Sequence, residues 1–170
     1  EAMVRKLRML RVHGIEQRYH HDLHGYNSRL DELQASILRI KLRRLTQWND
    51  RRVEIARRYS ELLRRLPIET PRLAEGNTHT YHVYAVLTER RDALQQHLVA
   101  RGISTIIYYP LPLHLQKVYA DLGYRVGDFP VAEAISHQIL PLPIYPELSD
   151  AEVDRSLREG MADIQLITGE

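Results

Sequence analysis

The stretch YHVYAVLT, residues 81–88, decides the fold class, because the spacing of apolar residues changes there. Before it, apolar residues recur with the period of an amphipathic helix. Within it, apolar and polar residues alternate and Tyr and Val are frequent, which predicts a β-strand. The sequence therefore predicts an α/β protein in which a long helix precedes helices packed on a small sheet.

The region before this strand has three parts. Residues 1–12 look like the end of a helix, and because the chain starts inside that pattern, we expect it to be a piece of a longer protein. Residues 13–27 are polar and rich in histidine, which indicates a loop. From Leu30 to Leu66 the helical spacing returns, with a break expected at Trp48–Asp50 and an end at Pro67.

Short elements are expected in the second half. Residues 67–80 are rich in turn formers, so we expect a domain boundary there, with 1–66 on one side and 67–170 on the other. Beyond the first strand, the patterns predict a helix at 90–101 closed by Gly102, a second strand at 104–109, an extended connection at 110–114, short helices near 115–121 and 130–138, and a last helix capped by Ser149 and Glu152.

Composition excludes several classes of protein. Basic and acidic residues nearly balance, 24 against 22, so no general attraction to nucleic acid or to a membrane surface follows. No apolar run approaches the roughly 20 residues of a membrane span. The absence of cysteine excludes disulfides and thiolate metal sites, and it is in keeping with a cytoplasmic location.

Arginine pairs recur along the long helix and stripe one of its faces. Such a face can follow the phosphates of DNA, which leaves a DNA-binding or regulatory module as the alternative function. Acidic residues interleave with the stripe, and that pattern favours a solvated face with ion pairs. The pairs are Arg43/Arg44, Arg51/Arg52, Arg57/Arg58 and Arg64/Arg65.

Histidines gather at two places, and each was considered as a metal site. A zinc site needs three or four ligands in fixed geometry, and neither cysteine nor an HExxH pattern supports one, so we expect no metal. The histidines concerned are His20, His21, His24, His79 and His82.

The segment HGYNSRL, residues 24–30, leads into the long helix. Gly25 gives the backbone freedom to turn, Asn27 or Ser28 can cap the helix, and Ser28 with Asp31 resembles a capping box. A helix N-terminus can also hold an anion such as a phosphate, so capping and phosphate binding are both open here.

Two tyrosines end the expected second strand. Tyr108 and Tyr109 precede Pro110, and His114 follows on the next loop. Residues in such loops commonly line pockets in α/β folds, although buried aromatic residues with a polar tip would give the same pattern.

Four motifs, in order, resemble the sugar aminotransferases of the DegT/DnrJ/EryC1/StrS family. They cover nearly the whole chain, and their style is most similar to members that act on 3-keto sugars. They are RMLRVHG with QRYHHDLHGYNSRLDELQ, THTYHVYAV, GISTIIYYPLPLHLQKVY, and GDFPVAEAISHQILPLPIYPELS.

This resemblance implies the C-terminal part of a type I pyridoxal phosphate (PLP) enzyme, which works as a homodimer with a shared active site. It implies transfer of an amino group from an amino acid, typically glutamate, to a nucleotide-linked ketosugar. The family's Schiff-base lysine precedes the matched region, and none of Lys6, Lys41 or Lys117 has a matching context. We therefore expect this segment alone to be inactive.

The resemblance also implies roles for five residues. Asn27 matches the asparagine that reaches the PLP phosphate of the neighbouring subunit, and an amide can donate to a phosphate oxygen. Tyr19 and Arg29 match residues near the cofactor and substrate. Relatives usually have His-Tyr-Pro where this chain has Tyr108 first, so imidazole acid–base chemistry is lost there. His114 is expected beside the substrate; the identity of the sugar and the position aminated stay open.

Overall fold

The computed structural model describes residues 1–161, which fold as two compact units. The first is Glu1–Leu45 and the second starts at Thr46. None of the helices in this described part is long and apolar enough to cross a membrane. The boundary expected between 1–66 and 67–170, which concerns the domains of a complete enzyme, stays a prediction.

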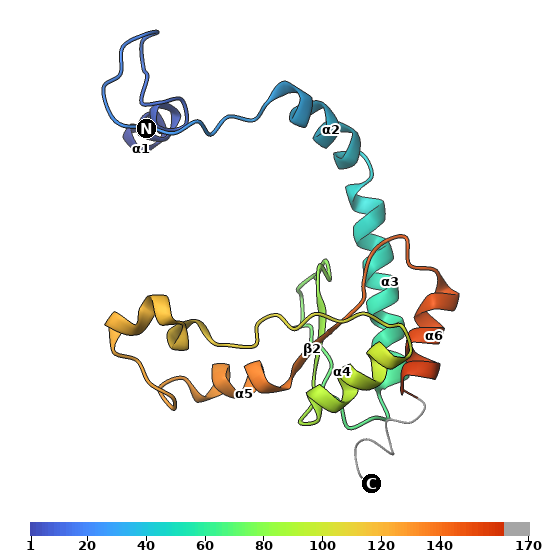
Figure 1. The fold of residues 1–170 in the computed structure, drawn as a ribbon. Coiled ribbons are helices and arrows are strands. Elements are labelled where there is room, and N and C mark those ends of the chain that lie inside the picture. The colour runs from blue at the N-terminus through green and yellow to red at the C-terminus, as the bar shows by residue number, and fades with distance from the viewer. Residues whose placement is uncertain (162–170) are drawn as a thin grey trace. The chain divides into compact units, whose positions relative to one another are not determined.

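The first unit consists of two helices and the segment that joins them. Helix α1 spans Ala2–Leu10, and helix α2 spans Glu32–Leu42 (Figure 1). The joining segment folds back on the end of α1, where Val12 pairs with Asn27 in an isolated antiparallel bridge. The expected helix end and loop are therefore confirmed.

The break in the long helix lies at Arg43–Arg44, between α2 and α3 (Leu45–Leu63), so the expected break at Trp48–Asp50 is wrong. Asn and Asp favour turns, but in α3 the packing of one buried face against the rest of the second unit overrides that local preference. Neither arginine at the real break is a helix breaker, so the sequence carried no signal for it.

A two-stranded antiparallel sheet forms the centre of the second unit. Strand β1 (Tyr84–Leu87) confirms the predicted strand, and it pairs with β2 (Ile139–Leu142) so that Tyr84 faces Leu142. No strand was expected at 139–142, a segment that contains Pro141. In the sheet, β2 pairs with β1 along one edge only, so the missing N–H of a proline on its other edge costs no ladder bond.

The predicted second strand at 104–109 is wrong. These residues run as extended chain without a strand partner. Ile103 and Ile107 nevertheless pack on the core, which explains the apolar pattern. Apolar alternation predicts an extended backbone, but it does not predict which strand will supply the hydrogen bonds.

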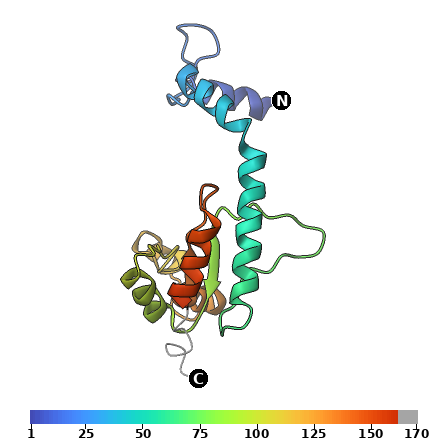
Figure 2. The same cartoon turned by 90° about the vertical axis from the view of Figure 1, so that its right-hand side faces the viewer.

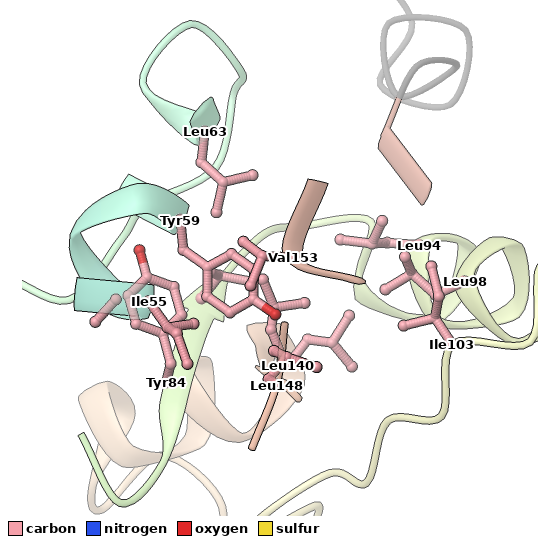
Figure 3. Close-up of a cluster of buried hydrophobic side chains, with 13 residues drawn as sticks. Ile55, Tyr59, Leu63, Tyr84, Leu94, Leu98, Ile103, Leu140, Leu148 and Val153 are labelled. Atoms are coloured by element: carbon pink, nitrogen blue, oxygen red, sulfur yellow. The ribbon is translucent and has the colours of Figure 1, made fainter. Parts of the chain in front are cut away.

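The core lies between α3 and the sheet, with α4 (Arg91–Ala100) and α6 (Asp150–Met161) closing it. On α3, Ile55, Tyr59 and Leu63 recur one helical turn apart and are all at most 1% exposed. Figure 3 shows these side chains pointing towards Tyr84 of β1, Leu140 of β2 and Val153 of α6. In Figures 1 and 2, α6 lies beside α3.

The remaining helices follow the predictions closely. Short 3-10 helices η1 (Leu113–Leu115) and η2 (Lys117–Leu122) precede α5 (Pro130–Gln138), which packs on β1. The capping box at the start of α6 is confirmed, because Ser149 N–H and Oγ donate to Glu152 at 2.9 and 2.6 Å and Glu152 N–H donates back to Oγ at 3.3 Å. This arrangement lowers the pKa of Glu152, chiefly through the hydroxyl.

Candidate functional site

An open hollow of about 870 Å³ lies in the second unit, lined by the segment that ends in η1 and by α5. Most of its wall is apolar or aromatic, and few polar side chains reach it. A concave, largely apolar site with a few placed polar groups is typical of small-molecule pockets. The residues that matter for its chemistry are Tyr108, Tyr109, Leu111, His114, Phe129 and Ile135.

His114 and Glu133 are hydrogen-bonded to each other at this wall. The imidazole Nε2 of His114 lies 2.9 Å from Oε1 of Glu133, and their side chains are only 8% and 14% exposed. His114 comes from η1 and Glu133 from the first turn of α5, so the pair joins two segments that are distant in sequence.

The Glu133 carboxylate also organises the turn before α5. Both of its oxygens accept the Gly127 N–H at 2.9 Å, and Oε1 accepts the Phe129 N–H at 3.3 Å. The Gly127 N–H foremost, and then His114, hold the pKa of Glu133 below its ordinary value. An ionised carboxylate accepts hydrogen bonds only, so the Nε2 atom of His114 carries the proton in this pair.

Aromatic packing fixes the imidazole from a second side. The ring of Phe129 lies 4.8 Å from that of His114, and Tyr124 meets Phe129 edge-on at 5.2 Å. Offset and edge-on ring pairs each contribute about 0.5–1.5 kcal/mol beyond the area they bury. His114 is therefore held both by a hydrogen bond to a carboxylate and by a tilted aromatic ring packed against it.

Tyr108 and His114, two of the predicted site residues, line this same hollow. Tyr108 is 44% exposed and Tyr109 76% exposed. The alternative that Tyr108 and Tyr109 are buried core aromatic residues is therefore wrong. The residues near them that enter the core are Ile103 and Ile107.

Asn27, Tyr19 and Arg29 belong to the first unit, and all three are exposed. The backbone of Asn27 pairs with Val12, and its side chain has no hydrogen bond within residues 1–161. Tyr19 has a φ of 70°, and the guanidinium of Arg18 lies 5.0 Å from the centre of its ring. The amide of Asn27 is thus free to bind a group from outside the unit.

The expected helix cap is wrong. Helix α2 starts at Glu32 with Asp31 as its N-cap residue, and no side chain caps it. Ser28 instead donates its N–H to the Arg11 carbonyl at 2.9 Å, which keeps residues 27–30 extended beside the end of α1. The start of α2 is therefore separated from Asn27, and its free N–H groups do not adjoin that amide.

Gly25 serves close packing rather than a turn. A Cβ atom on Gly25 would overlap the backbone of Gly14, and one on Gly14 would overlap the carbonyl of Leu23. Gly14 also has a φ of 75°, which glycine adopts without strain. These two glycines let the joining segment lie directly against the end of α1, and this contact presents Asn27 at the surface.

Sequence reasoning missed Glu133 and Phe129. The motif GDFPVAE, residues 127–133, carried the signal, because Pro at the first helical position with Glu in the first turn indicates a helix start whose carboxylate turns back to the preceding backbone. That motif was matched to the family without giving its residues a role.

The candidate histidine ligands have other contacts. His79 Nδ1 accepts the Tyr81 N–H at 2.8 Å, and His21 Nδ1 lies 3.0 Å from the His13 carbonyl oxygen. Within residues 1–161, no group of three or more His, Asp or Glu side chains is placed to hold a metal ion.

Comparison with known proteins gives the chain a family. A sequence model described as the DegT/DnrJ/EryC1/StrS aminotransferase family matches residues 1–158. One relative, the "Pleiotropic regulatory protein" of Geobacillus stearothermophilus, is 43% identical over 155 residues, which is 89% of this chain and 42% of the relative. Another, the "dTDP-3-amino-3,4,6-trideoxy-alpha-D-glucose transaminase" of Streptomyces venezuelae, is 46% identical over 147 residues, 86% of this chain and 39% of the relative.

A solved structure agrees with this match. The crystal structure of S. venezuelae DesV in complex with a ketimine intermediate superposes with a TM-score of 0.88 at 44% identity. The overlap covers 92% of this chain and 43% of that one. The chain thus spans about two fifths of the length of the relatives that it matches.

Proposed function

The chain belongs to the DegT/DnrJ/EryC1/StrS aminotransferase family, and we propose that it is the C-terminal part of an enzyme that moves an amino group from glutamate to a nucleotide-linked ketosugar. The observation that carries this proposal is the family match over residues 1–158, together with 46% identity to a protein named as a dTDP-amino-sugar transaminase. The keto group is placed at carbon 3 of the sugar, because that relative's name puts the amino group there.

The cofactor in this proposal is PLP, which supplies the electron sink of amino transfer. Asn27 fits one side of a phosphate site, because its exposed amide is unpartnered within the described residues and can donate to a phosphate oxygen without adding charge. The lysine that holds PLP is assigned to the part of the enzyme preceding this chain. Lys6, Lys41 and Lys117 are all exposed and lie on α1, α2 and η2.

The other site residues bind and orient substrates. Arg29 offers a guanidinium for a carboxylate or a phosphate group, and Tyr19 lies in the same segment. Tyr108 can donate a hydrogen bond from its phenol to the sugar. His114 contributes one of the few polar groups of the largely apolar hollow.

Two subunits complete each site in this proposal, and the enzyme is placed in the cytoplasm. The exposed apolar side chains of α2 support a partner, because large exposed apolar patches mark interaction surfaces. They include Leu33, Ile37, Leu38, Ile40 and Leu42.

Amino transfer from labelled glutamate tests the function. The complete protein is incubated with PLP, ¹⁵N-glutamate and a dTDP- or UDP-linked 3-ketohexose, and the product is examined by mass spectrometry. Incorporation of ¹⁵N into the sugar is expected. Absence of transfer with every ketosugar offered, combined with tight binding of duplex DNA, would favour the regulatory alternative instead.

A further inference from the structure

We propose that Glu133 is a positioning residue for His114, holding its imidazole so that Nδ1 is the acceptor that the hollow offers to a hydroxyl or N–H group of the substrate. This inference rests on the proposed function for the nature of the ligand, a nucleotide-linked sugar. The orientation of the ring rests on the geometry of the pair alone.

Glu133 contacts His114 but does not itself line the hollow. His114 lines the hollow together with Tyr108 and Phe129, whereas Glu133 is not among the lining residues. The carboxylate instead contacts His114 Nε2 and the N–H groups of Gly127 and Phe129. It is thus placed to orient the ring without touching a ligand in the hollow.

The proton of the neutral imidazole is fixed by this contact. A neutral imidazole has one N–H and one lone pair, and the nitrogen that faces a carboxylate takes the N–H. The lone pair is then left on Nδ1, which makes no hydrogen bond to any of residues 1–161. A hydrogen-bond donor facing Nε2, or a carboxylate facing Nδ1, would have reversed this assignment.

An oriented acceptor in an apolar wall gives selectivity. A sugar hydroxyl or an amide N–H that meets Nδ1 forms a hydrogen bond, while a carbonyl or phosphate oxygen there leaves two acceptors facing each other. Phe129 packs against the ring at 4.8 Å, and this contact favours the orientation in which Nε2 faces Glu133. Glu133 and Phe129 together therefore determine which ligand group His114 accepts.

Long-range ¹H–¹⁵N NMR of the histidine side chains tests the orientation in the full 170-residue chain. At about pH 8.5, about two units above the ordinary imidazole pKa, the spectrum identifies which nitrogen carries the proton. We expect a single Nε2–H form for His114. The variant Glu133→Met keeps the bulk of the side chain and removes the acceptor, so it should give a mixture of both forms. The matched control Glu147→Ala, which alters an exposed carboxylate, should leave His114 unchanged.

An Nδ1–H form in the unaltered chain would overturn the inference, whether or not the variant folds. An unchanged Nε2–H form in folded Glu133→Met would overturn it as well. His137, exposed on α5, serves as an internal reference whose spectrum should be the same in every variant.

Ligand binding to the complete protein tests whether Nδ1 of His114 accepts a hydrogen bond from the substrate. When UDP-glucose or dTDP-glucose is added, the Nδ1 resonance of His114 should move as it accepts a hydrogen bond, and Glu133→Met should bind that probe about tenfold more weakly. Binding of either probe without a change at Nδ1 would contradict the acceptor role and leave the proposed function standing. Failure of both probes and of amino transfer, with the Nε2–H form present, would contradict the proposed function instead.

Discussion

The guanidinium of Arg51 on α3 lies 2.7 Å from Oδ1 of Asp150 on α6 and donates a second hydrogen bond, of 2.8 Å, to the Leu148 carbonyl oxygen. Two helical turns further along α3, Arg58 Nε lies 2.8 Å from Oδ1 of Asp154. The arginine stripe is thus engaged, at these two positions, in joining α3 to α6. This agrees with the expectation of a face with ion pairs.

Replacing Arg51 should loosen the junction between α3 and α6. We expect Arg51→Met to lower the free energy of unfolding by about 1–2 kcal/mol, mostly because the Leu148 carbonyl loses a charged donor, since exposed ion pairs themselves contribute little. Urea denaturation measures the change. Arg57→Met, at an exposed neighbouring position, should change stability by no more than about 0.5 kcal/mol. Equal effects of both changes on the free energy of unfolding would show that the contacts of Arg51 with α6 do not stabilise the fold.

Acid should remove the contribution of the Asp150 carboxylate to this junction. The hydrogen bond from Arg51 holds the pKa of Asp150 below its ordinary value. A carboxyl whose folded pKa is lowered stabilises the fold above its unfolded pKa of about 3.9, and this effect disappears as pH falls through the lowered value. The stability difference between the unaltered chain and Asp150→Asn should therefore be full at neutral pH and shrink below about pH 4. A difference that is independent of pH would contradict this.

Tyr59 should make the fold sensitive to alkali. Its ring is fully buried, its hydroxyl donates to the Pro143 carbonyl at 2.7 Å, and burial raises its pKa. Because the raised pKa favours the neutral phenol, its contribution is complete below the unfolded pKa of about 10 and is lost as pH rises beyond it. Tyr59→Phe should cost about 1–2 kcal/mol at neutral pH and reduce the loss above about pH 10.

The control for that prediction is Tyr109→Phe, because Tyr109 is 76% exposed. This change should leave both the stability at neutral pH and the loss of stability above about pH 10 nearly unchanged. If Tyr59→Phe loses as much stability at alkaline pH as the unaltered chain does, another group causes that loss.

Much of the fold could be predicted, because it depends on local patterns. The capping box of Ser149 and Glu152, the proline that starts α5 and the alternation of β1 each concern neighbouring residues. The pairing of β1 with β2 could not be predicted, since it joins Tyr84 to Leu142, which are far apart in the sequence.

In the candidate site, too, residues within local motifs could be predicted, whereas contacts between distant segments could not. The motifs identified Tyr108 and His114, which line one hollow. The contact of His114 with Glu133 depends on how η1 packs beside α5, so no spacing within the sequence indicates it. The start of α2 was misplaced for a similar reason, because Ser28 bonds to Arg11 across the joining segment instead of capping the helix.

The exposed face of α2 should cause self-association. Leu33, Ile37 and Ile40 lie on one side of the helix and are 75%, 49% and 63% exposed. We expect dimers or larger species of the 170-residue chain in sedimentation experiments, and Ile37→Lys should shift them towards monomer. Ile106→Lys, a change of the same type at a position 59% exposed, should not. A monomer at every concentration would contradict this prediction.

The 170-residue chain alone should be catalytically inactive. Its lysines are Lys6, Lys41 and Lys117, all exposed, and we expect none of them to be the family's cofactor lysine. After incubation with PLP and reduction with borohydride, peptide mapping should find no lysine labelled in stoichiometric amount, and no amino transfer should occur. Stoichiometric labelling of one of them, together with turnover, would show that this segment carries the chemistry itself.

Asn27→Ala in the complete enzyme should weaken PLP retention and leave the fold intact. The side chain of Asn27 has no partner within residues 1–161, so little stability depends on it. A phosphate would lose one hydrogen bond to a charged group, about 1.5–3 kcal/mol, or about tenfold to hundredfold in affinity. Ser28→Ala, whose hydroxyl caps no helix here, is the matched control and should retain PLP normally.

Mixed dimers test most directly whether Asn27 completes the cofactor site of the neighbouring subunit. In one dimer, one subunit carries Asn27→Ala and its partner lacks the cofactor lysine; in the other, both changes are on the same subunit. The account predicts that PLP, measured by its absorbance after dialysis, stays in the first dimer and is lost from the second. The reverse result would place the contact within one subunit, and equal retention by both dimers would contradict the phosphate role of Asn27.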